Sequence, residues 1–421
     1  MRVCPIRKTR PSHKRFETLS MRSAPDSFAA MICAEPKKPT EKISTLEPET
    51  RKDSAWFRLE NEEEVDSPAL LVYPERVEEN IRRMIAMAGD VNRLRPHVKT
   101  HKLPEVIRLQ MAQGITKFKC STIAEAEMTA DCGAADVMLA HQPIGPKVQR
   151  FIQLVKRFPT TRFSTIADSA EVLRALSTAA AAAKISVEVL LDVDCGQHRT
   201  GIEPSANAAG LYRLLCSLPG LKPGGLHAYD GHIVDRDIAE RTKKCEAALG
   251  TVRKFRADLL NVGLPVPRVV AGGTPTFPIH ARQSDVEASP GTLVFWDASY
   301  EWDCPDMKFL SAALVLTRVV SKPCGNRLCL DLGHKSIAAE NPHPRVVFLN
   351  LPDVKFISHS EEHLVVETPN AAEIELGQCI YGVPWHICPT VALHAEAVIV
   401  RNGRAQEERW NVVARQRRLT V

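Results

Sequence analysis

One segment of the chain places a lysine between two histidines in a setting that suits amine chemistry. Residues 95–102 read Arg-Pro-His-Val-Lys-Thr-His-Lys and lie at the end of a β-like run. Because side chains alternate along a strand, His97, Lys99 and His101 share one face. Where such a face lines a buried strand end, shielding from water and neighbouring cations favour a neutral, nucleophilic amine. Periodicity alone is explained better by a surface lysine at a strand exit.

A second segment predicts an anion site. Residues 271–276 read Ala-Gly-Gly-Thr-Pro-Thr and come directly after another β-like run. Glycines let backbone N–H groups approach an anion closely, and a turn of this kind adds positive potential. Gly272, Gly273 and Thr274 are therefore predicted to bind a phosphate group, with an ordinary glycine turn as the alternative.

An arginine and a tyrosine follow two neighbouring β-like runs. Arg199 lies in the segment Asp192–Gly201, and Tyr229 stands within His-Ala-Tyr-Asp-Gly-His at residues 227–232. A guanidinium is permanently charged and forms planar paired hydrogen bonds, so Arg199 can hold an oxygen of a ligand. The alternatives are an arginine that pairs with an aspartate to brace its loop and a tyrosine that packs on the rim.

A fourth segment predicts a metal site. Residues 384–390 read Pro-Trp-His-Ile-Cys-Pro-Thr. In an extended segment residues i and i+2 point the same way, so His386 and Cys388 are predicted to face one metal ion. Imidazole and thiolate together suit zinc, and two protein ligands fit a site completed by water and substrate. By itself, a His-x-Cys pair is usually incidental.

The segment 95–102, preceded by the strand-helix unit at 67–74, resembles the D-serine dehydratase and D-threonine aldolase family. The members of that family are pyridoxal-phosphate enzymes with the alanine racemase-type fold, and the resemblance covers about residues 65–400. It implies that Lys99 binds pyridoxal 5'-phosphate covalently. It further implies cofactor contacts at Arg199, Gly272, Gly273 and Thr274, and the position of Tyr229 at a strand end makes it a further candidate contact.

The His-x-Cys segment narrows this resemblance. It is similar to the Pro-x-His-x-Cys-x-Thr segment of eukaryotic-type, zinc-dependent D-serine dehydratases, whereas D-threonine aldolases more often have aspartate at the second position. The resemblance implies that His386 and Cys388 bind Zn²⁺ or another divalent metal. Residues 330–336 and 360–363 also resemble family segments, with His363 as a partner of a metal ligand.

The elements that must position these residues alternate between β-like and helical patterns. Eight β-like runs and seven helical stretches between residues 67 and 277 predict a (β/α)8 TIM-type barrel. An open doubly wound sheet is the alternative. The predicted strands are Ala69–Val72, Arg93–Lys99, Lys117–Ser121, Asp136–Ala140, Arg162–Ile166, Ser186–Val193, Leu221–Tyr229 and Val266–Gly272. Short strand-like runs after residue 286 predict a C-terminal antiparallel β domain.

Composition bounds the remaining organisation. Of 55 Lys/Arg and 50 Asp/Glu, seven bases and two acids lie in residues 1–30, which leaves 48 of each in the rest of the chain. We therefore predict a basic, disordered extension and linker at 1–55, a pyridoxal-phosphate-binding barrel at 56–283 and a metal-bearing β domain at 284–421. The neutral body argues against nucleic-acid binding, and no apolar run is long enough to span a membrane.

Twelve scattered cysteines without a C-x-x-C pair predict reduced thiols in a cytoplasmic protein, or in an organellar one if the basic extension is a transit peptide. The resemblance implies a homodimer and a small-molecule D-amino acid substrate. The function expected is a lyase that dehydrates D-serine to pyruvate and ammonia. The alternatives are a D-threonine or D-3-hydroxy amino acid aldolase, a racemase or decarboxylase on the same fold, and a non-catalytic pyridoxal-phosphate-binding protein.

Overall fold

The computed structural model describes residues 56–421. The predicted extension at 1–55 lies outside the described residues. None of the helices in the described part of the chain is long and apolar enough to cross a membrane.

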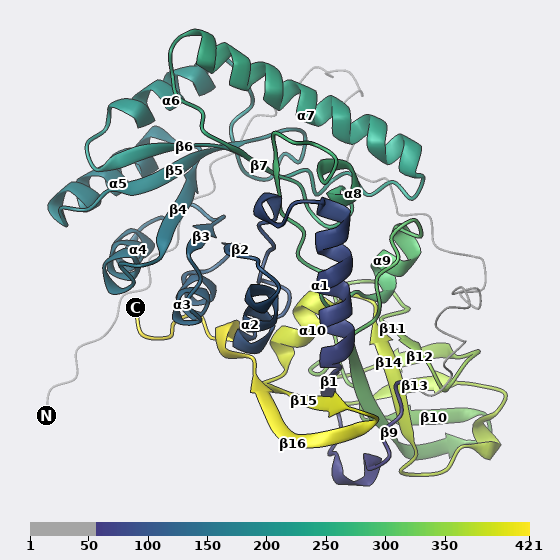
Figure 1. The fold of residues 1–421 in the computed structure, drawn as a ribbon. Coiled ribbons are helices and arrows are strands. Elements are labelled where there is room, and N and C mark those ends of the chain that lie inside the picture. Colours follow the sequence, from purple (N-terminus) through teal and green to yellow (C-terminus); the bar gives the residue numbers. More distant parts are fainter. Residues whose placement is uncertain (1–55) are drawn as a thin grey trace, which may run out of the picture. The chain divides into compact units, whose positions relative to one another are not determined.

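A parallel sheet of seven strands forms the first part of the fold (Figure 1). Its strands pair in sequence order, each parallel to the next, and helices on the outer side connect them. The strands are β2 (Lys117–Cys120), β3 (Asp136–Leu139), β4 (Arg162–Ala167), β5 (Val187–Val193), β6 (Leu221–Ala228), β7 (Val269–Ala271) and β8 (Glu287–Ala288). This confirms the predicted fold class, a TIM-type barrel of parallel strands.

An irregular segment at residues 94–98 joins the two edges of this sheet. Leu94 forms a parallel bridge to Ala288 of β8, and His97 forms one to Lys119 of β2. The Arg95 N–H donates to the Ala288 carbonyl, and the Val98 N–H donates to that of Lys119, both over 2.9 Å. The segment predicted as the strand Arg93–Lys99 therefore closes the barrel without being a regular strand.

The predicted first barrel strand is placed wrongly by the sequence reading. Residues Ala69–Val72 do form a strand, β1, but it pairs with β9 and β15 of the second sheet. Conversely, β8 pairs with β7 beyond residue 283, where the sequence placed the domain boundary. β1 is a short apolar run and β8 has only two residues, and such runs carry no information about which sheet they join.

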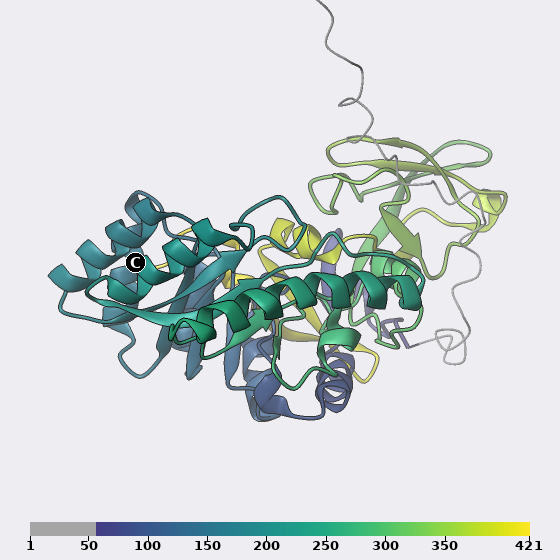
Figure 2. The same ribbon diagram turned by 90° about the horizontal axis from the view of Figure 1, so that it is seen from above.

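The helices begin at recognisable signals. Prolines open α1, α2 and α4, and hydroxyl or carboxylate side chains cap α3, α5, α6 and α7, as at Thr122, whose hydroxyl accepts from the Glu125 N–H. The bounds are α1 (Pro74–Ala88), α2 (Pro104–Ala112), α3 (Ile123–Asp131), α4 (Pro146–Arg157), α5 (Ala170–Ala182), α6 (Ala206–Ser217), α7 (Ile238–Asn261), α8 (Phe277–His280), α9 (Ala298–Asp303) and α10 (Ile387–Leu393). Figure 2 shows α7 as the long helix beside the sheet.

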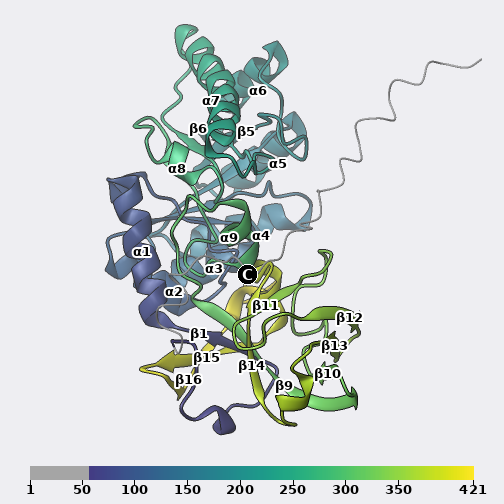
Figure 3. The same cartoon turned by 90° about the vertical axis from the view of Figure 1, so that its right-hand side faces the viewer.

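The second sheet is mostly antiparallel, as predicted, and contains β1 together with the C-terminal strands (Figure 3). Its order is β12-β13-β10-β9-β1-β15-β16, and β14 joins β9 to β11. Only the contact of β1 with β15 is parallel among its described pairs. The strands are β9 (Ala313–Cys324), β10 (Arg327–Leu330), β11 (Val346–Phe348), β12 (Lys355–His359), β13 (Leu364–Glu367), β14 (Cys379–Pro384), β15 (Glu396–Arg401) and β16 (Arg404–Asn411).

Inward-pointing side chains fill the barrel in layers, as in other closed parallel barrels. An apolar layer consists of Met138, Ile166, Leu190 and Val270, one each from β3, β4, β5 and β7. On the side of the strand starts lies a layer of charged residues, including Arg95, Asp136 and Glu287. On the side of the strand ends the lumen is polar, and the predicted site residues lie there.

Candidate active site

Lys99 follows the closing segment of the barrel and is half-buried. Its backbone N–H donates to His97 Nδ1 over 3.3 Å, which fixes the ring of His97 against the chain turn. Burial and the positive charges of Lys99 and Lys119 lower the pKa of His97 well below its ordinary value. The neighbourhood of Lys99 is therefore rich in cations, and His97 is neutral there.

The glycine segment forms a close-packed turn after β7. Gly272 has φ of +82°, and a Cβ at this position would lie 2.4 Å from the ring of His280. A Cβ at Gly273 would lie 3.0 Å from the ring of Tyr229. The N–H groups of Gly272 and Gly273 already donate to the Ala228 carbonyl and the Thr276 hydroxyl. The two glycines thus provide close approach, and their own amides are engaged within the protein.

Thr274 continues this turn toward the next loop. Its hydroxyl oxygen accepts from the N–H groups of Gly291 and Thr292 over 3.2 and 3.1 Å. Because both contacts use the oxygen as acceptor, the hydroxyl proton remains available to an anionic ligand. The buried turn can therefore present a donor to phosphate through Thr274.

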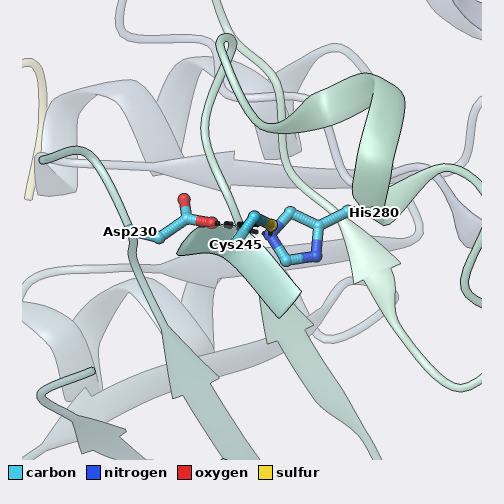
Figure 4. Close-up of side chains that lie close together, drawn as sticks. All are labelled: Asp230, Cys245 and His280. Carbon is cyan, nitrogen blue, oxygen red and sulfur yellow. Dashed lines mark hydrogen bonds and ion pairs between the residues drawn. The ribbon is translucent and has the colours of Figure 1, made fainter. Parts of the chain in front are cut away.

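A buried cluster braces the turn from behind (Figure 4). His280 Nε2 lies 2.7 Å from Asp230 Oδ2 and 3.4 Å from Cys245 Sγ, and Asp230 also accepts from the Thr276 hydroxyl over 2.8 Å. Although burial opposes it, the hydrogen bond from His280 lowers the pKa of Asp230. The ligand atoms of Asp230, Cys245 and His280 are close enough together to hold a metal ion, but as they stand they satisfy one another by hydrogen bonds.

Arg199 and Tyr229 come together at the same end of the barrel. The exposed Arg199 guanidinium lies over the Tyr229 ring, 4.9 Å from its centroid, and Lys119 Nζ lies 5.7 Å from that centroid. Tyr229 thus links the predicted arginine to the glycine turn, since its ring also faces Gly273. Within residues 56–421 Arg199 forms no ion pair with an aspartate, and the neighbouring Asp194 contacts His198 instead.

His386 and Cys388 lie beside the lysine segment. Cys388 Sγ is 3.1 Å from the hydroxyl of Thr100, the residue after Lys99, and 3.7 Å from that of Thr292. The predicted extended geometry is wrong, because His386 is the N-cap residue of α10 and Cys388 lies in its first turn. Asp297 positions this turn by accepting from the Ile387 N–H over 3.0 Å.

The His386–Cys388 pair is polarised. Although burial opposes both shifts, their mutual hydrogen bond raises the pKa of His386 to about 9 and lowers that of Cys388, where Lys99 adds to the effect. The environment therefore favours a thiolate, which is the form that ligates metals. His386 Nδ1 also contacts Glu340 through a short ion pair. The exposed side chain of His363 makes no such contact within the described chain, so Glu340 takes the place predicted for it.

The residues present fit both the pyridoxal 5'-phosphate and the divalent metal that the sequence implies. For a phosphorylated aldehyde, the structure supplies the Lys99 amine, the turn that a Cβ would fill at Gly272, and the two cations over Tyr229. His227 Nε2, buried in the same lumen, has no hydrogen-bond partner within the described chain. For a divalent metal, the imidazole and thiolate of His386 and Cys388 form a soft, open pair.

Sequence reasoning missed Lys119, Glu340 and Asp297. Lys119 carries a signal in the sequence, because it stands between Phe118 and Cys120 in a short strand that a barrel buries on both faces. Glu340 and Asp297 carry none, since their roles depend on loops far from His386 along the chain.

The fold and the site define a barrel enzyme with a cationic, glycine-lined mouth that meets a β domain at a histidine–cysteine pair. Residues 72–298 match the family model described as alanine racemase, N-terminal domain, and residues 312–400 match a serine dehydratase domain. The chain belongs to this family of fold III pyridoxal-phosphate-dependent enzymes, in the lyase group whose members act on D-hydroxy amino acids.

Individual relatives agree with this assignment. The chain is 33% identical to a D-threonine aldolase of Arthrobacter sp. over 359 residues, which is 83% of this chain and 93% of that protein. It is 24% identical to the D-serine dehydratase of Dictyostelium discoideum over 80% of this chain and 94% of that one. The crystal structure of D-threonine aldolase from Filomicrobium marinum superposes with a TM-score of 0.78 at 31% identity, covering 83% and 95%.

Proposed function

We propose that the protein is a metal-assisted, pyridoxal-phosphate-dependent lyase that dehydrates D-serine or a closely related D-3-hydroxy amino acid. The observation that carries the proposal is the contact between Thr100 and Cys388, over 3.1 Å, which brings the predicted lysine segment and the predicted metal pair together. Two features that lie almost 290 residues apart in the chain thus meet in one place.

The chain's own residues divide the work. Lys99 would hold the cofactor through its amine, and the same amine would act as the base that takes the α proton of the substrate. The turn at Gly272–Thr274 and the cation Arg199 hold anionic groups of the bound molecules. The cofactor, when bound, supplies an electron sink for the bond that breaks at the α carbon.

His386 and Cys388 would hold the divalent metal. A metal at this pair would act as a Lewis acid on the β-hydroxyl of the substrate. Glu340 orients the His386 ring through its Nδ1 atom, so that the other ring nitrogen would serve as the ligand. The buried Asp297 holds the turn in place from the barrel side.

An aldolase is the second candidate, and the observation that favours it is the higher identity to the Arthrobacter D-threonine aldolase, 33% against 24% for the Dictyostelium D-serine dehydratase. The feature that favours dehydration is Cys388, which resembles the second ligand of the zinc-dependent dehydratases. Both reactions need the same amine and the same metal pair.

D-threonine separates the two outcomes because it is a substrate for both. Purified protein, loaded with cofactor and zinc, is incubated with D-threonine and with D-serine. We expect 2-oxobutanoate and pyruvate with ammonia; release of glycine and acetaldehyde from D-threonine would instead assign the aldolase. L-serine is the matched control and should give no product.

The attachment of the cofactor is tested separately by substitution. Lys99→Ala should lose the visible absorbance band that arises when an amine condenses with the cofactor aldehyde. Lys102→Ala, which removes the neighbouring lysine paired with Glu125, should keep that band. The assignment is overturned if the wild-type protein lacks the band or if Lys99→Ala retains it.

A further inference from the structure

Lys119 is a buried amine that the chemistry derived above leaves without a defined role. It is the third residue of β2 and 2% exposed. Its backbone is locked to the closing segment, because its N–H donates to the Pro96 carbonyl and its own carbonyl accepts from Val98, both over 2.9 Å. As the bridge partner of His97, it directs its side chain to the same side of the sheet.

The amine of Lys119 has no hydrogen bond and no ion pair anywhere in residues 56–421; its nearest defined contact is the Tyr229 ring. Lys117, two residues earlier on the same face of β2, is fully paired: its Nζ donates to Glu287 over 2.6 Å and to the Asn92 carbonyl over 2.7 Å. Of these two lysines, only Lys117 has an anionic partner within residues 56–421.

The carboxylates that face this part of the lumen are already engaged. Asp192 lies 2.6 Å from His227 Nδ1, and Asp230 is bonded to His280 and Thr276. An isolated ammonium is costly to bury, so a protein retains one where a ligand supplies the missing anion. Burial first, and then the charge of Lys99, lower the pKa of Lys119 to about 7, in keeping with an amine whose counter-charge is absent.

We propose that Lys119 is a further binding residue of this site, whose amine takes an anionic oxygen of the bound molecule. The inference rests on the proposed function, because it assumes that the barrel mouth binds the cofactor and the D-amino acid. Two oxygens have the required chemistry: the oxygen on the pyridine ring of the cofactor and the carboxylate of the substrate. The experiment distinguishes them.

Cofactor affinity is measured first, on the protein freed of cofactor. Pyridoxal 5'-phosphate and its 3-deoxy analogue, which lacks the ring oxygen, are titrated into wild type, Lys119→Met, Lys119→Gln and Lys119→Arg. A charge-assisted hydrogen bond is worth about 1.5–3 kcal/mol, so loss of the amine should weaken binding roughly tenfold to a hundredfold. Lys117→Met, on the same strand and face, should bind as wild type does.

Two results support the proposal and assign the source of the oxygen. If the ring oxygen is the partner, Lys119→Met and Lys119→Gln bind the full cofactor more weakly but the 3-deoxy analogue as tightly as wild type does. If the substrate carboxylate is the partner, cofactor affinity is unchanged and KM for the D-amino acid rises about tenfold or more with little change in kcat. In both cases Lys119→Arg retains most of the wild-type value.

Unchanged cofactor affinity together with unchanged KM in both neutral variants overturns the proposal. Because removing a buried, unpaired charge does not destabilise the fold, Lys119→Met and Lys119→Gln should keep the wild-type circular dichroism spectrum, and two neutral side chains of different polarity guard against one packing badly. Failure of the proposed function gives a different result, because the wild-type protein would then bind no pyridoxal 5'-phosphate at all.

Discussion

The buried amine of Lys119 also predicts how the free energy of unfolding of the ligand-free protein depends on pH. Its pKa is about 7 in the folded protein and near 10.5 when unperturbed, so between these values the unfolded chain binds a proton that the folded chain does not. Stability therefore rises with pH across that window. Lys119→Met should be more stable than wild type, by a few kcal/mol at pH 7 and by nearly nothing above pH ~10.5.

The measurement is urea unfolding of cofactor-free protein at several pH values, with the two proteins compared at each pH. Taking the difference removes the titration of all other groups. A constant difference between pH 7 and pH 10 would show that Lys119 keeps its proton in the folded protein.

At the same scale, metal content tests which cysteine serves as a ligand. We expect one zinc ion per chain, lost in His386→Ala and Cys388→Ala because each removes one of two protein ligands. Cys245→Ser is the matched control, since Cys245 belongs to the buried cluster with Asp230 and His280. Zinc that persists in Cys388→Ala but disappears in Cys245→Ser would move the site to the buried cluster.

The residue types were the most predictable part of this site. Choosing among them needed the family resemblance, because periodicity alone favours a surface lysine at Lys99 and a His-x-Cys pair is usually incidental. The structure brings Arg199, Tyr229 and the glycine turn together and places Cys388 beside Thr100. Glu340 and Lys119 were not predicted from the sequence, for different reasons. Glu340 reaches His386 only through the fold of a loop, whereas lysines in a strand are ordinarily read as solvent-facing.

At the scale of elements, the glycine turn after β7 depends on its missing side chains. Gly272→Ala would place a Cβ 2.4 Å from His280 at a φ of +82°, where side chains are disfavoured. We expect His280 and the turn to move apart, with cofactor affinity falling roughly tenfold or more. Affinity is measured by the same titration as for Lys119.

Gly250→Ala is the control for this variant. Gly250 lies within α7, where an added Cβ would meet nothing within 4 Å, so alanine should leave affinity unchanged and raise stability by about 0.5–1 kcal/mol. Equal affinities of Gly272→Ala and Gly250→Ala would show that the turn does not hold the ligand.

Element boundaries explain where the sequence reading went astray. The His-x-Cys segment was predicted to be extended, yet β14 ends at Pro384 and the chain turns at His386 into α10. Likewise, the strand predicted at Arg93–Lys99 bonds to both β8 and β2 but is too irregular for a ladder. Side-chain alternation does not hold beyond His97, because residues 98–101 form a turn in which the Lys102 N–H donates to the Val98 carbonyl. His101, predicted on the same face as Lys99, is fully buried and packs its ring edge-on against Phe295.

On the scale of the whole molecule, closure of the barrel depends on a buried charge network at the strand starts. Arg95 is 0% exposed and lies 2.5 Å from Asp136 of β3 and 2.8 Å from Glu287 of β8. Glu287 also pairs with Lys117 of β2 over 2.6 Å. One guanidinium thus ties the closing segment to both sides of the seam.

Arg95→Leu should therefore destabilise the cofactor-free protein by about 3–5 kcal/mol at pH 7, because it removes the buried guanidinium that pairs with both Asp136 and Glu287. Although burial opposes it, Arg95 lowers the pKa of both Asp136 and Glu287, so this contribution is present above the ordinary carboxyl range and is lost as pH falls below it. The difference in unfolding free energy between variant and wild type should shrink toward pH ~3, where the carboxylates of Asp136 and Glu287 are protonated.

Arg82→Leu is the control: it breaks a surface pair with Glu79 and should cost less than about 1 kcal/mol at either pH. If Arg95→Leu unfolds at the wild-type urea concentration at pH 7, the seam is held by its backbone hydrogen bonds and apolar packing, and the charge network contributes specificity of strand order without stability.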